Sequence, residues 1–254
     1  MENYLKIYQN KQEYDQEGNK PILGHIIDDI ELLNSSLRLN AENFPDANFR
    51  AALAEILEIN EGEEITAAKI AATTSLNVFN KSIADLKGVE HFAALRELYC
   101  DNNQLTSLDV SGCTALTRLW CYNNQLTSLD VSNNTALQDL ECNNNQLTSL
   151  DVSKNTALIV LYCSRNPLTS LDVSQNTALI QLLCSDNQLT SLDVSKNTAL
   201  EVLKCDNNQL ASLDISNAPE IIYIYENYDD RDGSCFCYDG ECNFCCDDGV
   251  QIIA

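Results

Sequence analysis

A 21-residue period is the sequence feature that most constrains the fold of this chain. Six consecutive units carry leucines at the same places and a cysteine at the sixth place, and these cysteines are Cys100, Cys121, Cys142, Cys163, Cys184 and Cys205. Periods of roughly 20 to 29 residues with regular leucines are typical of solenoids, in which each unit stacks on the next. The six cysteines therefore form a structural ladder, and we predict one stack of units.

Each unit contains a short segment in which apolar and polar residues alternate. In the first regular unit, alternation along a strand directs Leu98 and Cys100 into the core. The opposite side should carry Arg96, Glu97, Tyr99 and Asp101. One unit cannot bury its apolar side chains alone, so its neighbours must cover them. Stacked cysteines hold their Cβ atoms about 4.8 Å apart, longer than the roughly 3.8 Å of a disulfide, and we expect free thiols.

Two polar ladders accompany the leucines. The ninth place of each unit is an asparagine, in order Asn103, Asn124, Asn145, Asn166, Asn187 and Asn208. We expect these amides to bind backbone groups where the chain turns out of the strand. The second ladder is Asp109, Asp130, Asp151, Asp172, Asp193 and Asp214. Stacked carboxylates repel one another, so we expect hydrogen bonds from nearby backbone N–H groups or hydroxyls, with a calcium ladder as the alternative.

The return path of each unit is short and rich in Thr, Ser, Asp and Asn, which favour turns over helix interiors. We therefore predict an α/β repeat solenoid. It should be a right-handed leucine-rich-repeat coil with a parallel β-sheet on its concave face and turns or 3-10 segments on its convex face.

The segments outside the regular units define the expected domain organisation. Residues 1–40 form an N-terminal extension with a candidate helix over 21–33, and residues 41–73 form a helical cap. The solenoid covers 74–226, and an acidic, cysteine-rich tail or cap covers 227–254.

The expected cap contains two helices. Asp46 or Asn48 is the predicted N-cap of the first, and Thr66 is the predicted N-cap of the second. A first, atypical unit follows from Leu76 and is one residue longer than the others, and Ile221–Tyr225 is the expected last strand.

The chain resembles bacterial leucine-rich-repeat proteins of the internalin type, in particular those with 21-residue units and a cysteine ladder. The resemblance covers about residues 43–220 and includes FPDxxF at 44–49, NxxIxDLxGVExF at 80–92 and the LTSLDVSxNTAL units. It implies a secreted or cell-surface protein that acts by adhesion or partner binding. The first residues do not have the pattern of a signal peptide, which predicts a cytoplasmic protein if Met1 is the native start.

The negative charge narrows the classes of partner. Asp and Glu total 38 against 15 Lys and Arg, which gives a formal charge of −23 and repels phosphate backbones. We therefore expect no nucleic-acid partner. No apolar run approaches the roughly 18 residues of a membrane span, so no membrane insertion is expected. We expect a monomer that binds a protein, with a glycan as the alternative partner.

A second group of cysteines lies near the C-terminus. Cys235 and Cys237 form a CxC pair and Cys242 and Cys245 form a CxxC pair, a spacing that can hold zinc in tetrahedral thiolate geometry. Disulfides or free thiols are the alternative for this acidic tail. No other cofactor is expected.

The outward places of the strands differ from unit to unit and form the candidate binding surface. We expect a docking surface centred on Tyr99, Trp120, Tyr122, Tyr162 and Leu183, with Arg118 and Lys204 as polar orienters and Tyr223 and Tyr225 at its end. Aromatic side chains on a rigid sheet are typical of binding hot spots. Cross-strand aromatic packing that only stabilises the sheet is the alternative.

Catalysis has little support in the sequence. The two histidines, His25 and His91, lie outside the six regular units, and no Gly-rich phosphate loop, GxSxG or HExxH motif is present. We expect a protein that is not an enzyme. A structural or surface-layer spacer without a specific partner is one alternative, and a carboxylate-dependent hydrolase is another.

Overall fold

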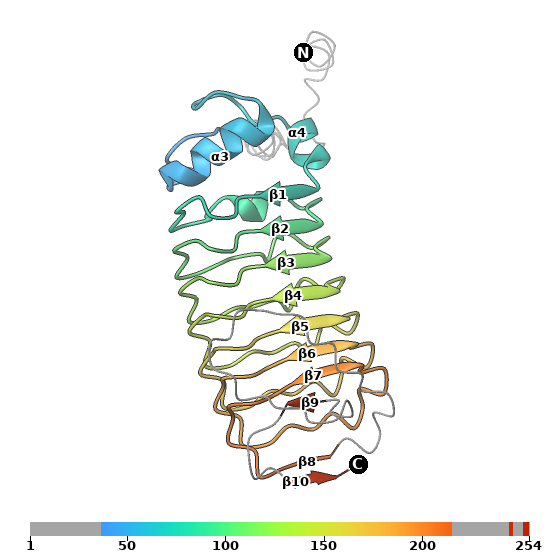
Figure 1. Cartoon of the computed structure of the whole chain (residues 1–254). Helices are drawn as coiled ribbons and strands as arrows, with labels where there is room; N and C mark the ends of the chain where they lie inside the picture. Colours follow the sequence, from blue (N-terminus) through green and yellow to red (C-terminus); the bar gives the residue numbers. More distant parts are fainter. Residues whose placement is uncertain (1–36, 215–243, 246–250, 254) are drawn as a thin grey trace, which may run out of the picture. The chain divides into compact units, whose positions relative to one another are not determined.

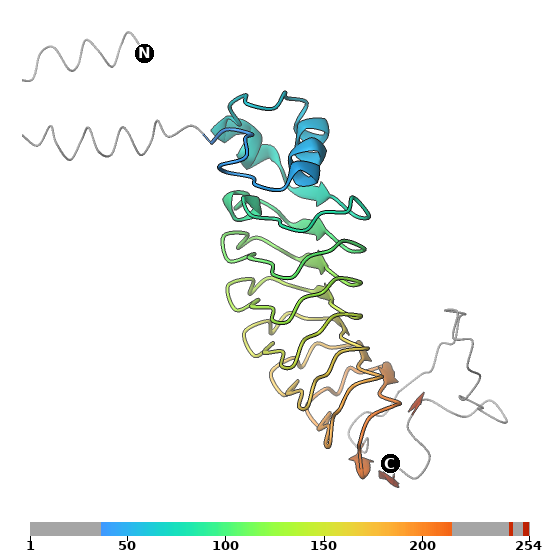
Figure 2. The ribbon, with the colours of Figure 1, turned by 90° about the vertical axis from the view of Figure 1, so that its left-hand side faces the viewer.

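The computed structural model describes residues 37–214, 244–245 and 251–253, and the expected helix over 21–33 lies outside these. Arg38–Ala254 belongs to one compact unit. Within it, the chain forms a ladder of parallel strands on one side and turns on the other, preceded by two helices (Figure 1; Figure 2). The predicted leucine-rich-repeat solenoid is confirmed.

The cap consists of α3 (Ala47–Leu57) and α4 (Ala67–Ala72). Asp46 is the N-cap of α3, where its carboxylate accepts hydrogen bonds from the backbone N–H groups of Asn48 and Phe49. Thr66 caps α4 in the same way through Lys69 N–H. The buried face of α3 carries Phe49, Ala52, Leu53 and Leu57.

The main sheet contains eight parallel strands in the order β1-β2-β3-β4-β5-β6-β7-β9. Their bounds are β1 Ser75–Asn77, β2 Glu97–Tyr99, β3 Arg118–Trp120, β4 Asp139–Glu141, β5 Val160–Tyr162, β6 Gln181–Leu183, β7 Val202–Lys204 and β9 Phe244–Cys245. From β2 to β7, each residue pairs with the residue 21 positions later, as Leu98 does with Leu119. The sequence period is therefore the register of the sheet.

The first unit is one residue longer, because Leu76 on β1 pairs with Leu98, 22 positions later. Gly88, in the left-handed region with φ of 105°, precedes the 3-10 helix η1 (Val89–His91) of this unit. A Cβ at Gly88 would lie 2.2 Å from the Phe44 ring of the cap. Only glycine therefore fits this position, where the cap packs against the repeats.

The core is a column of leucines and cysteines. The middle leucine of each regular strand and the cysteine that follows it are fully buried, as Leu98 and Cys100 are. The ladder cysteines form no disulfides, as the strand spacing predicts. Burial raises the pKa of the Cys163 thiol to about 12, so this thiol stays protonated and behaves as a small apolar side chain.

The ninth-place asparagines close the end of each strand. The Asn124 side-chain amide donates hydrogen bonds to the carbonyls of Cys100 and Cys121, and its oxygen accepts one from Leu105 N–H. Asn145 repeats this pattern one unit later. Each side chain thus joins neighbouring units through groups that would otherwise be buried without partners, which confirms the predicted role.

The aspartate ladder is satisfied locally. Asp109 accepts a hydrogen bond of 2.9 Å from Ser111 N–H, and the aspartates of the next four units make the same contact. Hydrogen bonding to Ser111 lowers the pKa of Asp109. This arrangement is the expected Asx turn, and it removes the need for a cation between the units.

A second asparagine ladder was not assigned a role in the sequence analysis. It comprises the fully buried Asn134, Asn155, Asn176 and Asn197 on the return path. The Asn155 amide donates to the carbonyls of Val131 and Asn134 in the preceding unit. In the first regular unit Cys113 occupies this place, and its thiol contacts the Val89 carbonyl. The return segments of neighbouring units are therefore joined by side-chain hydrogen bonds.

The C-terminal edge of the main sheet differs from the prediction. Ile221–Tyr225, the expected last strand, lies outside the described residues, and the strand that pairs with β7 is β9. A separate two-stranded sheet joins β8 (Ser212–Asp214) to β10 (Gln251–Ile253). Residues beyond the repeats therefore return to pair with both strands, a long-range contact that the period does not encode.

Candidate strand-face binding site

The candidate site lies on the solvent side of the main sheet, which we call the strand face. In each of β2 to β7 the middle residue is buried and the two flanking residues are half-buried. The flanking residues lie in columns across the sheet, because the strands pair without any offset between regular units. Side chains that are far apart in sequence therefore become neighbours.

An aromatic cluster occupies the first rungs of this face. The Tyr99 and Trp120 rings meet edge to face, with centroids 4.8 Å apart and an interplanar angle of 73°. The Tyr122 ring is tilted by 48° against the Trp120 ring, with the two centroids 6.5 Å apart. Such offset and edge contacts are the favourable geometries for aromatic pairs. Three of the predicted binding residues thus form one contiguous group.

Arg118 holds this cluster in place. Its guanidinium is 3.1 Å from Glu97 Oε1, 3.1 Å from Asp139 Oδ2 and 3.1 Å from the Tyr99 hydroxyl. The Trp120 indole N–H also donates to Asp139 Oδ2, at 3.3 Å. The predicted polar orienter Arg118 is therefore engaged within the site, where it fixes the aromatic rings. Hydrogen bonding to Tyr99 is the main reason why the pKa of Arg118 is raised.

Glu141 lies in the column between two aromatic residues. It pairs with Trp120 on β3 and with Tyr162 on β5. Burial, assisted by Asp139 and Asp101, raises its pKa to about 7. Burial also raises the pKa of Tyr162, whose hydroxyl donates a hydrogen bond to Gln181 Oε1.

An apolar strip continues the face toward the C-terminal rungs. Val160 and Leu183 are half-buried on β5 and β6, and Ile159, just before β5, is 37% exposed. Lys204 follows Leu183 in the same column on β7. The predicted central residues are thus distributed over consecutive rungs, with acidic and aromatic side chains at one end and apolar ones at the other.

Two predicted outward positions are buried instead. Asp101 was expected on the accessible face but is only 3% exposed, and Ser185, which the 21-residue period places in the same row, is 2% exposed. Asp101 accepts a hydrogen bond of 2.7 Å from the Asn102 side chain, and Ser185 N–H donates to Ser164 Oγ. These short side chains form local hydrogen bonds at the strand ends, so they do not extend the accessible surface.

Phe79 is a residue of this face that the sequence analysis missed. It is 50% exposed, and it lies at the end of β1 in the row of Asp101 and Tyr122. The signal was available: Phe79 precedes Asp101 by 22 residues, the spacing of the longer first unit. The row of Asp101 and Tyr122 therefore begins one unit earlier, with an exposed aromatic residue.

Several predicted positions lie outside the described residues. These are Tyr223 and Tyr225 of the binding surface and Cys235, Cys237 and Cys242 of the zinc hypothesis, while only the backbone of Cys245 is described, in β9. Within the described residues, no three His, Cys, Asp or Glu side chains are grouped to hold a metal ion. In that same part of the chain, no helix is long and apolar enough to cross a membrane.

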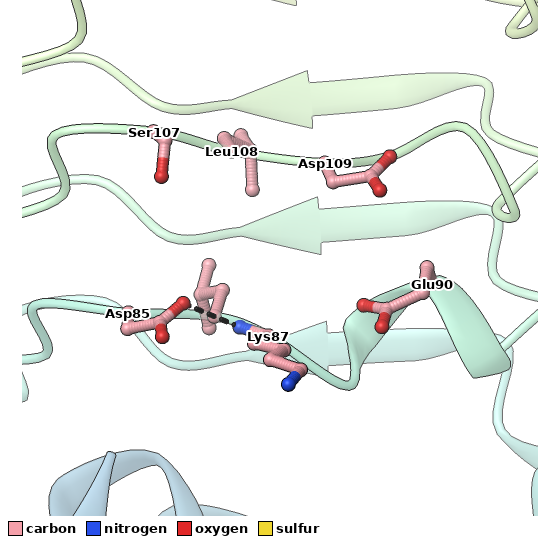
Figure 3. Close-up of a pocket in the computed structure, with 7 residues that line it drawn as sticks. Asp85, Lys87, Glu90, Ser107, Leu108 and Asp109 are labelled. Carbon is pink, nitrogen blue, oxygen red and sulfur yellow. Dashed lines mark hydrogen bonds between the residues drawn. The ribbon is translucent and has the colours of Figure 1, made fainter. Parts of the chain in front are cut away.

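A pocket of about 360 Å³ opens on the return segments of the first two units (Figure 3). Its lining consists of Asp85, Leu86, Lys87, Glu90, Ser107, Leu108 and Asp109. Its carboxylates already accept backbone hydrogen bonds, from Lys87 N–H to Asp85 and from Gly88 N–H to Glu90. These acids therefore serve the turns, and the strand face remains the better candidate.

Comparison with known proteins identifies the repeats. The family model described as leucine-rich repeats (two copies) matches residues 93–134 and 114–155. Over 68 residues the chain is 44% identical to internalin J of Listeria monocytogenes. This aligned segment is 27% of this chain and 7% of internalin J. The chain thus matches only a small part of the length of this curated relative.

Two solved internalin structures support the same fold. Internalin InlF of L. monocytogenes has a TM-score of 0.55 at 20% identity, covering 71% of this chain and 65% of its own. Internalin C2 of the same species has a TM-score of 0.55 at 20% identity, and the match covers 73% of this chain and 93% of internalin C2. The functional domain of InlJ, described as including a cysteine ladder, is 31% identical over 74% of this chain and 56% of its own, with a TM-score of 0.47.

Proposed function

Because this chain is a leucine-rich-repeat protein with repeats of the internalin type, we propose that its strand face binds a protein partner and that Tyr99, Trp120, Tyr122 and Tyr162 are the main contacts. Proteins of this type are protein-interaction modules. In this chain the strand face carries that role, and the chain acts by binding a partner and not as an enzyme.

The contiguous aromatic cluster is the observation that carries this proposal. Tyr99, Trp120 and Tyr122 are half-buried, so each ring keeps an accessible edge or face. Large aromatic side chains contribute disproportionately to protein interfaces, because they bury much area and have few rotatable bonds. Phe79, after β1, and Ile159, before β5, are further exposed apolar residues of the repeats.

Rigidity of the face supports the same role. The Arg118 contacts with Tyr99 and Asp139 hold side chains that would otherwise lose rotamer freedom on binding. A surface that is already ordered loses less conformational entropy when a partner docks. A docking surface built in this way gains affinity without additional contact area.

Alanine substitution of Trp120 and Tyr162 together tests the proposal. Capture of proteins from a cell extract by the immobilised chain should fall at least about tenfold, since two hot-spot side chains are lost. Ile56→Ala is the matched control, because Ile56 is an exposed apolar residue on α3. Circular dichroism and the melting temperature of the variants establish that the solenoid remains folded.

The outcome separates the strand face from the remaining surface. Loss of captured proteins in the double variant, with full capture by Ile56→Ala, supports the proposal. Equal capture by the double variant and the unmodified chain contradicts it, provided that the double variant is folded.

A further inference from the structure

Glu141 has an unusual position within the strand face. It lies on β4 directly between Trp120 of β3 and Tyr162 of β5, in the same column of the sheet. Adjacent strands are about 4.8 Å apart, so the carboxylate is flanked by an aromatic side chain on each side. A carboxylate beside two aromatic side chains brings a negative charge and two π systems together, and both kinds of group attract a cation.

The charges around Glu141 are not balanced. Asp139 lies on the same strand and Asp101 at the end of β2, and both raise the proton affinity of Glu141. Arg118 is the cation that faces this group, but its hydrogen bonds go to Glu97, Asp139 and Tyr99. Among the described residues, no side chain donates a hydrogen bond or forms an ion pair with the Glu141 carboxylate.

A second carboxylate oxygen nearby is also without a partner. Asp139 Oδ2 accepts from Arg118 and Trp120, whereas the buried Asp139 Oδ1 has no hydrogen-bond partner in the described part of the chain. Buried or half-buried carboxylate oxygens without donors are unfavourable, because they have lost water without replacing its hydrogen bonds. The site therefore has unused capacity for a positively charged donor.

We propose that Trp120, Glu141 and Tyr162 form a subsite for a lysine or arginine side chain of the protein partner. The inference rests on the proposed function and specifies the chemistry of its partner. The incoming cation would form an ion pair with Glu141 and lie between the two rings. Cation–π contacts with the two rings would add to the attraction of the ion pair.

The charge of the whole chain favours the same partner. At −23, the chain attracts basic surfaces at long range, and this attraction accelerates their association. A neutral glycan could stack on Trp120, but it would leave the Glu141 charge uncompensated. Charge complementarity therefore selects a basic protein segment as the occupant.

Trp120 provides a direct readout, because it is the single tryptophan of the chain. The probe is an acetylated, amidated peptide of alternating lysine and serine, and the comparison peptide has glutamine in place of each lysine. Titration of the full chain is followed by tryptophan fluorescence. We expect the lysine peptide to change the emission and the glutamine peptide to leave it unchanged.

Glu141→Gln is the decisive variant, because it preserves shape and removes the charge. Its affinity for the lysine peptide should be lower by about fivefold or more. Glu201→Gln is the matched control: it removes the same net charge at an exposed position just before β7, and it should bind as the unmodified chain does. Equal binding by Glu141→Gln and Glu201→Gln would overturn the proposal, as would equal binding of the two peptides.

Acidification gives an independent arm of the test. Glu141 is neutral below its pKa of about 7 and charged above it, so the lysine peptide should bind more tightly at pH 8 than at pH 6. The Glu141→Gln variant should lose this difference, and its retention there would contradict the assignment.

The two proposals fail in different ways. If the Trp120 and Tyr162 double alanine variant loses protein capture while Glu141→Gln keeps both capture and peptide affinity, the strand face binds but the cation subsite is wrong. If the folded double variant keeps capture, the proposed function itself is wrong.

Discussion

At the scale of single residues, the left-handed positions show how the repeat tolerates variation. The third residue after each regular strand has a positive φ, and it is asparagine in four units, at Asn102, Asn123, Asn144 and Asn207. Arg165 and Asp186 take this place in the other two, with φ of 55° and 54°. Asparagine is tolerated there because its short polar side chain reduces the steric penalty of the left-handed region.

Arg165→Asn should therefore stabilise the solenoid. We expect the free energy of unfolding to rise by about 0.5–1 kcal/mol, since arginine is disfavoured at this φ. The exposed ion pair of Arg165 with Asp186, at 3.5 Å, offsets little of this gain. Urea denaturation measures the change. The reverse substitution, Asn144→Arg, should lower the stability, and no difference in either variant would contradict the explanation.

The buried asparagines of the return path should tolerate no charge. In Asn155→Asp, an ionised carboxylate would face the carbonyls of Val131 and Asn134, to which the amide now donates. We expect a loss of about 3 kcal/mol or more at pH 7, and a smaller loss in acid, where the carboxyl can donate one hydrogen bond. Asn133→Asp, at the exposed position next to Asn134 in the preceding unit, serves as control and should change the stability by less than about 0.5 kcal/mol.

Glu141 gives a pH dependence of stability with a definite sign. Its pKa is about 7 in the folded chain against 4.5 for an unperturbed glutamate, so the folded state binds the proton more tightly. The stability of the chain should therefore fall relative to that of Glu141→Gln as the pH rises from about 4.5 to about 7. Urea midpoints at pH 5 and pH 8 measure this. A constant difference between the two proteins would show that Glu141 titrates normally.

At the scale of elements, Asp46 links the helical cap to the repeats. One carboxylate oxygen caps α3, and the other accepts hydrogen bonds from Ala84 N–H at 2.8 Å and Asp85 N–H at 3.2 Å. The same side chain therefore begins a helix and holds the first, atypical unit. Sequence reasoning found the first role, because N-caps have a local signature, and missed the second, because its partners are 38 and 39 residues away.

Asp46→Ser separates these two roles. Serine can still cap α3, but one hydroxyl cannot also reach Ala84 and Asp85, so we expect a loss of about 1–2 kcal/mol in the free energy of unfolding. Thr66→Ser at the N-cap of α4 is the matched control and should be nearly neutral. Equal stability of Asp46→Ser and the unmodified chain in thermal denaturation would show that the contact with the first unit contributes nothing.

At the scale of the whole molecule, the cysteine ladder is an internal probe of cooperativity. Seven described cysteines, from Cys100 to Cys205, are buried and form no disulfide. Each unit contacts mainly its neighbours, so stability is shared through the interfaces between units. Because these interfaces are nearly identical along the regular repeats, we expect the stack to unfold as one unit.

Iodoacetamide labelling followed by peptide mass spectrometry tests this cooperativity. At pH 8 the seven thiols should be unreactive in the native chain, since burial excludes the reagent and holds the pKa of Cys113 and Cys163 at about 12. In moderate urea all seven should react at one rate. A gradient from Cys205 toward Cys100 would instead indicate fraying from the C-terminal end.

The sequence by itself determined the period, the strand positions, the inward leucines and cysteines, and the ninth-place asparagine ladder. These follow from local alternation together with stacking, because a unit that cannot bury its own apolar side chains allows only one arrangement of its neighbours. Only the tertiary structure decided that β9 pairs with β7, that Asp101 is buried, and that Arg118 holds the aromatic cluster. Each of these depends on which side chains meet across units or beyond the repeats, and such contacts have no signal in the period itself.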